Sequence, residues 1–278
     1  MTKHQNWFQS WFDTPYYHIL YKQRNNTEAE NFIRKLVTYL ETDKNQSILD
    51  LACGKGRHSI FLNSLGYKVK GVDLSSQSIL EATKYANDRL EFEIHDMRTP
   101  LDTKYDLILN LFTSFGYFDN LEDNLSALNT IKSGLSNQGI GVIDFMNSPY
   151  IIEHLVPHNT IEIDGIHFEL KRSVSDGVIT KKITVTDKGL SHNYIERVRA
   201  FDKADFTSMF SKLNLNLIDS FGSYDLDPYN VESSKRLILI FKKNALFLIT
   251  HFGCFDWISS CNLVFKFKAN VFKIATYI

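Results

Sequence analysis

The sequence predicts an α/β protein: a doubly wound, seven-stranded sheet with an antiparallel β meander inserted into it. Three observations lead to this prediction, namely apolar runs that end in polar residues, helical patterns between those runs, and a later block in which polar and apolar residues alternate. Repeated alternation of strand and helix indicates a mostly parallel sheet with right-handed crossovers. The chain, at 278 residues, is long enough for one such domain and an insertion.

Composition and charge disfavour several classes of protein. Hydrophobic residues make up 44% of the chain and charged residues 23%, which is ordinary for a globular protein. The formal net charge of −1 gives no basic stripe for a nucleic-acid partner. Three cysteines without zinc-ligand spacing favour a reduced compartment, so we expect a cytoplasmic protein without a metal site. No apolar run is long enough to predict a membrane span.

Residues 1–45 are rich in aromatic side chains, and we expect them to form a helical lid. Asp13-Thr14-Pro15 is typical of a helix start with proline in the first turn. A second helix follows, because Phe32, Leu36, Val37 and Leu40 repeat at helical spacing. The aromatic side chains before it either close over a bound ligand or pack on the sheet.

The segment from Ile48 to His58 is the most informative part of the chain. Its apolar run ends in Asp50-Leu51-Ala52-Cys53-Gly54-Lys55-Gly56, which is typical of a buried parallel strand followed by a glycine turn. A helix beginning at Arg57 would offer free N–H groups and a partial positive charge to a nucleotide-like ligand. The dinucleotide-binding pattern fails, because Ser59 stands where the third glycine is required.

The next strands bring polar residues to the same edge of the sheet, because ligands of parallel sheets lie at the carboxyl ends of the strands. Asp73 ends the second strand, about 20 residues after the first, where a carboxylate can accept from ribose hydroxyls. Asp96-Met97 and Asn110 hold the corresponding positions on the third and fourth strands. We expect the first five strands at 48–51, 67–74, 90–95, 105–112 and 141–146, and the helices between them at 57–65, 75–88 and 120–135.

Residues 150–200 change to an alternating pattern, which predicts an antiparallel meander. Its strands are expected at 167–174, 178–185 and 192–199, with turns at Asp176-Gly177 and Lys188-Gly189. A helix near 202–213 and strands near 215–224 and 235–242 would then return to the main sheet. Residues 244–278 show no clean period and form a C-terminal tail of unknown role.

Four motifs together make the chain resemble the class I S-adenosylmethionine-dependent methyltransferases: Asp50 to Gly56, Gly71 to Ser75, Asp96 to Arg98 and Phe112 to Phe118. The resemblance is strongest over 46–146 and is weaker to about residue 243. Within the family it is greatest to small-molecule enzymes such as amino-sugar and glycine N-methyltransferases. It implies a Rossmann-like cofactor domain formed by 46–149 and 201–243, a substrate cap at 150–200, and S-adenosylmethionine as cofactor.

The resemblance also implies site residues. Asp73 would take the ribose hydroxyls, Asp96 the adenine amine, and Asn110 and Phe112 would line the methyl end. The full set expected at the cofactor is Tyr16, Tyr21, Asp50, Ala52, Gly54, Gly56, Asp73, Leu74, Asp96, Met97, Asn110 and Phe112. The candidates for the acceptor pocket are Tyr17, Tyr117, Arg199 and Tyr224. Structural roles are the alternative: Asp50 and Asp73 would be caps and Met97 ordinary core, and no residue stands out as a catalytic base.

These expectations combine into a methyltransferase that modifies a nitrogen, or an oxygen, of a small molecule, acting as a monomer or a homodimer. Two alternatives stay open: methylation of a nucleic acid or protein, and a cofactor-binding module without turnover. Asn110-Leu111-Phe112-Thr113 does not match the Asn/Asp-Pro-Pro-Tyr/Phe pattern of base-amino methyltransferases, which disfavours flipped-base chemistry. Asn147-Ser148-Pro149-Tyr150 follows the fifth strand instead and is expected to begin the insertion.

Overall fold

The computed structural model describes residues 7–22, 26–112 and 114–244. Its contacts divide the chain into one unit of Met1–Asn244 and another of Ala245–Ile278. The tail expected after residue 243 therefore lies, except for Asn244, outside the described residues.

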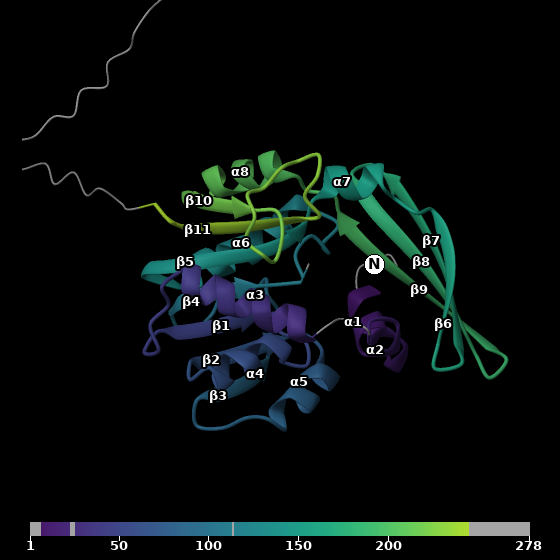
Figure 1. Ribbon diagram of the computed structural model, residues 1–278, viewed down its shortest axis with the longest axis horizontal. Helices are drawn as coiled ribbons and strands as arrows, with labels where there is room; N and C mark the ends of the chain where they lie inside the picture. The colour runs from purple at the N-terminus through teal and green to yellow at the C-terminus, as the bar shows by residue number, and fades with distance from the viewer. Residues whose placement is uncertain (1–6, 23–25, 113, 245–278) are drawn as a thin grey trace, which may run out of the picture. The chain divides into compact units, whose positions relative to one another are not determined.

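The main sheet has seven strands, and the predicted fold class is confirmed (Figure 1). Its strands are β1 (Ser47–Leu51), β2 (Lys68–Asp73), β3 (Leu90–Ile94), β4 (Tyr105–Asn110), β5 (Leu135–Met146), β10 (Leu215–Phe221) and β11 (Arg236–Lys243). They lie in the order β10-β11-β5-β4-β1-β2-β3. Strands β1 to β5 are parallel to one another, and β11 is antiparallel to both of its neighbours, β10 and β5. The order reverses between β1 and β4, where parallel α/β sheets bind their ligands.

Alternating side chains divide between two apolar cores, one on each face of the sheet. In β1, Ile48 packs in the core that also contains the buried face of α3 (Asn26–Tyr39), whereas Leu49 and Leu51 pack on the opposite face with α6 (Leu121–Gly134) and α8 (Lys203–Lys212). This alternation is the period of two that a strand imposes on its side chains. The helices are α1 (Trp7–Phe12), α2 (Pro15–Leu20), α3 (Asn26–Tyr39), α4 (Arg57–Ser64), α5 (Ser76–Thr83), α6 (Leu121–Gly134), α7 (Ser148–Glu153) and α8 (Lys203–Lys212).

Helix starts follow the capping residues that the sequence offers. The Thr14 hydroxyl accepts from the Tyr17 amide at the start of α2, and Asp202 forms a capping box with Asp205 at the start of α8. Helix α5 begins one residue after the predicted position and ends at Thr83, not 88, because Asn87 bridges to Leu90 in the turn that enters β3. The short helix α7 was not predicted.

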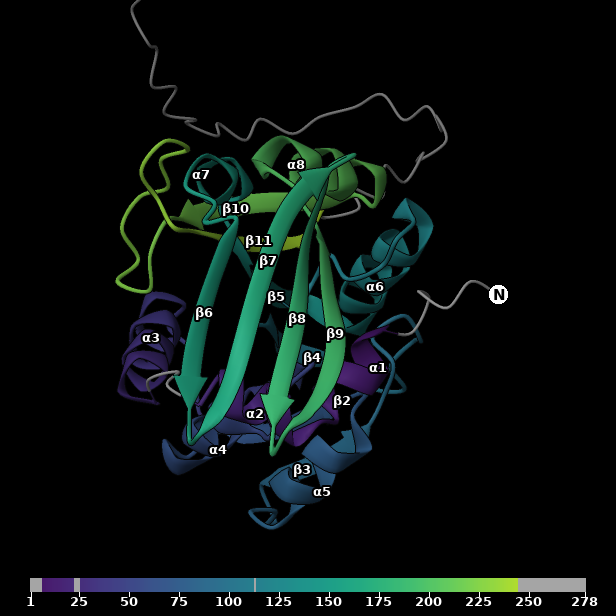
Figure 2. The same ribbon diagram turned by 90° about the vertical axis from the view of Figure 1, so that its right-hand side faces the viewer.

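The inserted sheet has four antiparallel strands, not three. They are β6 (His158–Ile163), β7 (Ile166–Ser175), β8 (Val178–Asp187) and β9 (Leu190–Arg199), in that order across the sheet. Strand β6 was missed because it is an edge strand whose residues are exposed or only partly buried, so its pattern carries little apolar signal. Figures 1 and 2 show α1 and α2 between this sheet and the main sheet.

The described part of the chain has neither a helix suited to a membrane nor a cluster of side chains suited to a metal ion. None of its helices combines the length and apolarity that a membrane span requires. Likewise, no group of three or more His, Cys, Asp or Glu side chains in these ranges has the arrangement of a metal site.

Candidate functional site

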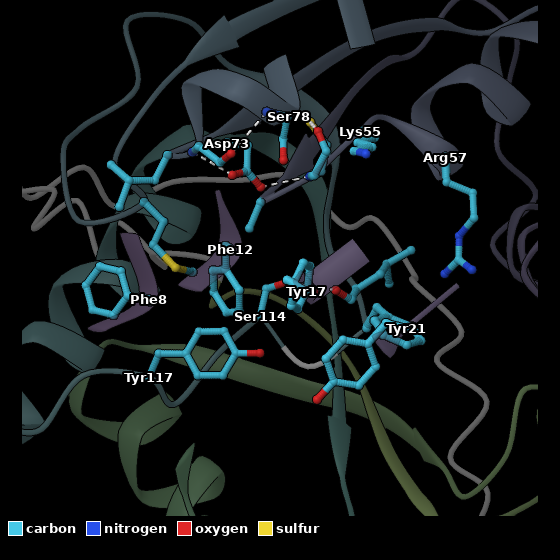
Figure 3. A pocket seen from close by; sticks show the side chains of 18 of the residues that line it. Phe8, Phe12, Tyr17, Tyr21, Lys55, Arg57, Asp73, Ser78, Ser114 and Tyr117 are labelled. Carbon is cyan, nitrogen blue, oxygen red and sulfur yellow. Dashed lines mark hydrogen bonds between the residues drawn. The ribbon is translucent and has the colours of Figure 1, made fainter. Parts of the chain in front are cut away.

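A cavity of about 350 Å³ opens at the carboxyl ends of the parallel strands, a size in the range of small-molecule sites. One side comes from the ends of β1 to β4, and the other comes from α1, α2 and the segment after β4 (Figure 3). The predicted site residues that line it are Tyr17, Tyr21, Ala52, Gly54, Asp73, Leu74, Asp96, Met97, Phe112 and Tyr117.

The turn after β1 depends on two glycines for different reasons. Gly54 and Gly56 both have left-handed backbones, with φ of 56° and 78°. A Cβ on Gly54 would meet no atom within 4 Å, so the turn leaves open space beside the cavity. A Cβ on Gly56 would lie 2.6 Å from the Phe92 ring, so this glycine lets α4 approach β3 closely. Gly56 is buried and does not line the cavity, although it was expected beside the cofactor.

Asp50 lies beneath the same turn and is 1% exposed. It accepts a 2.6 Å hydrogen bond from the Ser59 hydroxyl, which ties the end of β1 to α4. Burial raises the pKa of the Asp50 carboxyl to about 6, although the Ser59 hydrogen bond opposes the shift. Asp50 is absent from the cavity lining, and its contacts match the capping alternative.

Asp73 connects the ends of β1 and β2. Its Oδ2 accepts from the Gly54 amide at 2.8 Å, and its Oδ1 accepts from the Ser75 amide at 2.8 Å. Burial raises the pKa of this carboxyl, while the backbone hydrogen bonds lower it. Each carboxylate oxygen can accept more than one hydrogen bond, so Asp73 keeps acceptor capacity toward the cavity.

Asp96 and Met97 line the cavity at the end of β3. The Arg98 guanidinium donates to both carboxylate oxygens of Asp96, with an Nη2–Oδ2 distance of 2.6 Å. Burial raises the pKa of Asp96, but the hydrogen bonds from Arg98 outweigh it and leave the pKa lowered. Asp96 is therefore a fixed anion, oriented by its neighbour two residues along the chain.

The end of β4 carries a buried polar cluster. Asn110 is fully buried, and its Nδ2 donates to the Leu51 carbonyl at 2.9 Å. Asp144, on β5, accepts from the Phe112 amide, the Tyr224 hydroxyl and the Arg236 guanidinium. Asn110 and Tyr224 thus hold the strand ends together and do not line the cavity.

Two further predicted residues lie outside the cavity lining. The Tyr16 hydroxyl donates to Asp187 Oδ2 at 3.1 Å, so this side chain contacts the tip of the β8–β9 hairpin. The Arg199 amide donates to the Gly116 carbonyl, and its guanidinium lies 6.0 Å from the Phe201 ring centroid. Tyr16 and Arg199 therefore join the inserted sheet to its neighbours.

Sequence reasoning missed several lining residues. Phe8 and Phe12 belong to the aromatic segment that was expected to cover the ligand, but they were not singled out within it. Lys55 lies inside the glycine motif and Arg57 directly follows it, but only the glycines and Asp50 and Ala52 of this segment were predicted to contact the cofactor. His58 and His95 were expected beside the cofactor loops, but as surface or helix-start residues. The remaining residues that were missed are His18, Lys22, Cys53, Ser75, Ser78, Leu111, Ser114 and Phe118.

Two histidines in the lining, His18 and His58, are poor bases at neutral pH. Burial, followed by the positive charge of Lys55, lowers the pKa of His18 to about 4. Burial, followed by Arg57, lowers the pKa of His58 to about 3. The His95 Nε2 lies 3.1 Å from the Thr99 carbonyl, so this nitrogen is engaged within its own turn.

Comparisons with known proteins show which family this chain resembles. The family described as "Methyltransferase domain" matches residues 42–183. The glycine/sarcosine N-methyltransferase of Aphanothece halophytica is 28% identical over 141 residues, which is 49% of this chain and 52% of that protein. The dTDP-3-amino-3,4,6-trideoxy-alpha-D-glucopyranose N,N-dimethyltransferase of Streptomyces venezuelae is 25% identical over 186 residues, 63% of this chain and 78% of that one.

A solved structure shares the fold over most of the chain. The S-adenosylmethionine-dependent methyltransferase from Clostridium acetobutylicum ATCC 824 superposes with a TM-score of 0.70 at 18% identity, over 82% of this chain and 96% of that one. Among the curated sequence relatives, by contrast, this chain spans only about half the length of the glycine/sarcosine enzyme.

Proposed function

Because this chain belongs to the family of methyltransferase domains, we propose that it transfers a methyl group from S-adenosylmethionine to a nitrogen atom of a small-molecule acceptor. The observation that carries the proposal is the cavity at the carboxyl ends of β1 to β4, with Gly54, Asp73 and Asp96 along one side. Two sequence relatives are named as N-methyltransferases, and their acceptors are small molecules.

The charges along the cavity fit this cofactor. Asp73 and Asp96 lie at the ends of β2 and β3, where ribose hydroxyls and an adenine amine would find acceptors. Lys55 and Arg57 lie at the start of α4, where positive charge and free amides favour a carboxylate such as that of the methionine group. When bound, S-adenosylmethionine would supply a methyl group activated by a sulfonium.

The contribution of the chain would be alignment. Holding an acceptor in line with the methyl carbon lowers a barrier by roughly 7–11 kcal/mol when the geometry is good. His18, whose pKa is lowered to about 4 by burial and then by Lys55, is a weak base at neutral pH. A neutral amine needs no base before it attacks, whereas an alcohol is helped by one. This difference favours nitrogen over oxygen as the atom that is methylated.

The N-terminal helices and the inserted sheet would act as lid and cap. The N-terminal segment contacts the insertion at both hairpin tips. Tyr16 donates a hydrogen bond to Asp187, and Lys22 forms an ion pair with Asp164 at 2.9 Å. Between the two tips, Glu196 on β9 accepts hydrogen bonds from the Trp11 indole and the Tyr21 hydroxyl, each at 2.7 Å. We further propose residues 1–45 as the lid, 150–200 as the acceptor cap, and a cytoplasmic location for the chain.

Two measurements test the proposal. Isothermal titration with S-adenosylmethionine should give a single site, and release of S-adenosylhomocysteine should depend on an amine from a panel of amino sugars and amino acids. The matched alcohols, with oxygen in place of nitrogen, are the control and should support little turnover. Failure to bind the cofactor would refute the proposal, and binding without turnover on any acceptor would favour a cofactor-binding module. Size-exclusion chromatography would separate a homodimer from a monomer.

A further inference from the structure

One side of the cavity is a continuous row of aromatic rings, which we call the aromatic wall: Phe12, Tyr17, Tyr21 and Tyr117. The ring centroids of Phe12 and Tyr117 are 5.5 Å apart, those of Phe12 and Tyr17 are 4.9 Å apart, and those of Tyr17 and Tyr21 are 5.0 Å apart. Figure 3 shows these rings across the cavity from Asp73 and Ser78. The wall joins α1 and α2 to the segment after β4, so three parts of the chain contribute to it.

The acidic side chains in the described lining lie on the strand side of the cavity. They are Asp73 and Asp96, and each already receives hydrogen bonds, from two backbone amides or from Arg98. A cation at the aromatic wall would therefore be stabilised by the faces of the rings, which attract positive charge within about 6 Å of a ring centroid.

One ring of the wall, that of Tyr21, contacts the inserted sheet. The Lys181 ammonium lies 4.6 Å from the Tyr21 ring centroid, and the Tyr21 hydroxyl is bonded to Glu196. The ring and the hydroxyl of Tyr21 therefore both contact the inserted sheet. Phe12, Tyr17 and Tyr117 line the cavity, and the Phe12 ring contacts both of the other two.

We propose that Phe12, Tyr17 and Tyr117 form a binding site for a methyl-bearing onium group. The inference rests on the proposed function, which offers two such groups: the sulfonium of the cofactor and the methylated ammonium of the product. In the transfer, the methyl carbon leaves sulfur as it bonds to nitrogen, and the positive charge passes from sulfur to nitrogen. The resulting ammonium then releases a proton to water. A wall of rings would favour the charge at either atom without trapping it as a carboxylate would.

The first arm of the test concerns the cofactor. Dissociation constants for S-adenosylmethionine and for the neutral S-adenosylhomocysteine are measured by titration calorimetry in the wild-type chain and in Tyr17→Leu, Tyr117→Leu and Tyr17→Phe. If the wall recognises the sulfonium, both leucine variants should lose preference for the charged ligand by about 3- to 10-fold. Tyr17→Phe keeps the ring and should keep the preference. Tyr39→Leu, on α3 and outside the cavity lining, is the control for loss of a tyrosine.

The second arm concerns the acceptor side, with S-adenosylhomocysteine held at saturation. Choline is compared with 3,3-dimethylbutan-1-ol, in which carbon replaces the charged nitrogen. If the wall recognises the ammonium, the wild-type chain should prefer choline and the leucine variants should lose that preference. A change in either arm supports the onium site and assigns its source. Unchanged preferences in both arms, with cofactor binding intact, would overturn the inference while leaving the proposed function standing; absence of cofactor binding in the wild-type chain would refute the proposed function itself.

Discussion

The carboxylate of Asp73 accepts a hydrogen bond from the backbone amide of Gly54, with 2.8 Å between Oδ2 and N. The two residues are 19 positions apart: Gly54 lies in the turn after β1, and Asp73 ends the neighbouring parallel strand β2. Through this bond, a single side chain sets the shape of the glycine turn and also presents acceptor capacity to the cavity. The structural and the ligand-binding interpretations of Asp73 are therefore compatible.

Asp73→Asn should weaken S-adenosylmethionine binding by about 1–3 kcal/mol, because an amide supplies fewer acceptor sites to both Gly54 and the ribose. Calorimetric titration measures the change. Asp106→Asn is a matched control, since Asp106 also accepts a backbone amide, from Ser47 at 3.0 Å, but does not line the cavity. Equal loss of affinity in both variants would show that Asp73 has no specific role at the cofactor.

Gly54→Ala should reduce cofactor affinity more than it reduces stability. The substitution meets open space and incurs only the left-handed backbone penalty, roughly 1–2 kcal/mol. Gly165→Ala, at φ 77° in the turn before β7 and also in open space, should lose similar stability without changing affinity. Urea denaturation and titration calorimetry separate the two effects. Retention of full affinity in Gly54→Ala would place the cofactor away from this turn.

Glu196→Ala should release the N-terminal helices from the inserted sheet. The carboxylate receives hydrogen bonds from Trp11, Tyr21 and Lys181, and its side chain is 15% exposed. Leaving these donors unpaired should cost about 2 kcal/mol, and hydrogen exchange over residues 7–22 should become faster.

Glu169→Ala serves as the comparison for Glu196→Ala. Glu169 pairs with Lys171 on the same sheet, but the lysine is 59% exposed, so the loss should stay below about 1 kcal/mol. Similar exchange over residues 7–22 in both variants would show that Glu196 does not hold the N-terminal helices against the inserted sheet.

His58 should make the chain less stable at acid pH. Its folded pKa is lowered to about 3 by burial and then by Arg57, so the unfolded chain binds the proton more readily. Stability is then lost as pH falls from about 6.5 toward 3, by up to about 1.4 kcal/mol per pH unit. His58→Gln should flatten this part of the stability curve measured by urea denaturation, and a curve that keeps its slope in this variant would contradict the prediction.

Asp50 should affect the pH dependence of stability in the opposite direction to His58, over a pH range that overlaps that of His58. Its folded pKa is raised to about 6 by burial, so the folded chain binds the proton more readily than the unfolded chain. The carboxyl therefore lowers stability as pH rises from about 4 to 6, and the difference between the wild-type chain and Asp50→Asn should change over that window. If the stability difference between the two chains does not change with pH, the Asp50 carboxyl is not buried away from water as the structure indicates.

The residues from 46 to 146 specify their part of the fold locally. Each segment there carries a short-range signal: the run ending at Asp50, the glycine turn, and the strand ending at Asp73. The parallel strands, and the polar residues at their carboxyl ends, could therefore be predicted. Two elements were predicted less well because their local patterns are weak. Strand β6 is held by pairing with β7 along an exposed edge, and α5 ends early because of the turn at Asn87.

The sequence by itself determined that polar residues end successive parallel strands, because strand period and glycine turns are local properties of the chain. Only the tertiary structure decided which side chains reach the cavity. Asp50, Asn110 and Tyr224 turn into buried hydrogen bonds, whereas Phe8, Phe12 and Lys55 line the site. Those directions depend on contacts between segments far apart in sequence, and no local pattern encodes them.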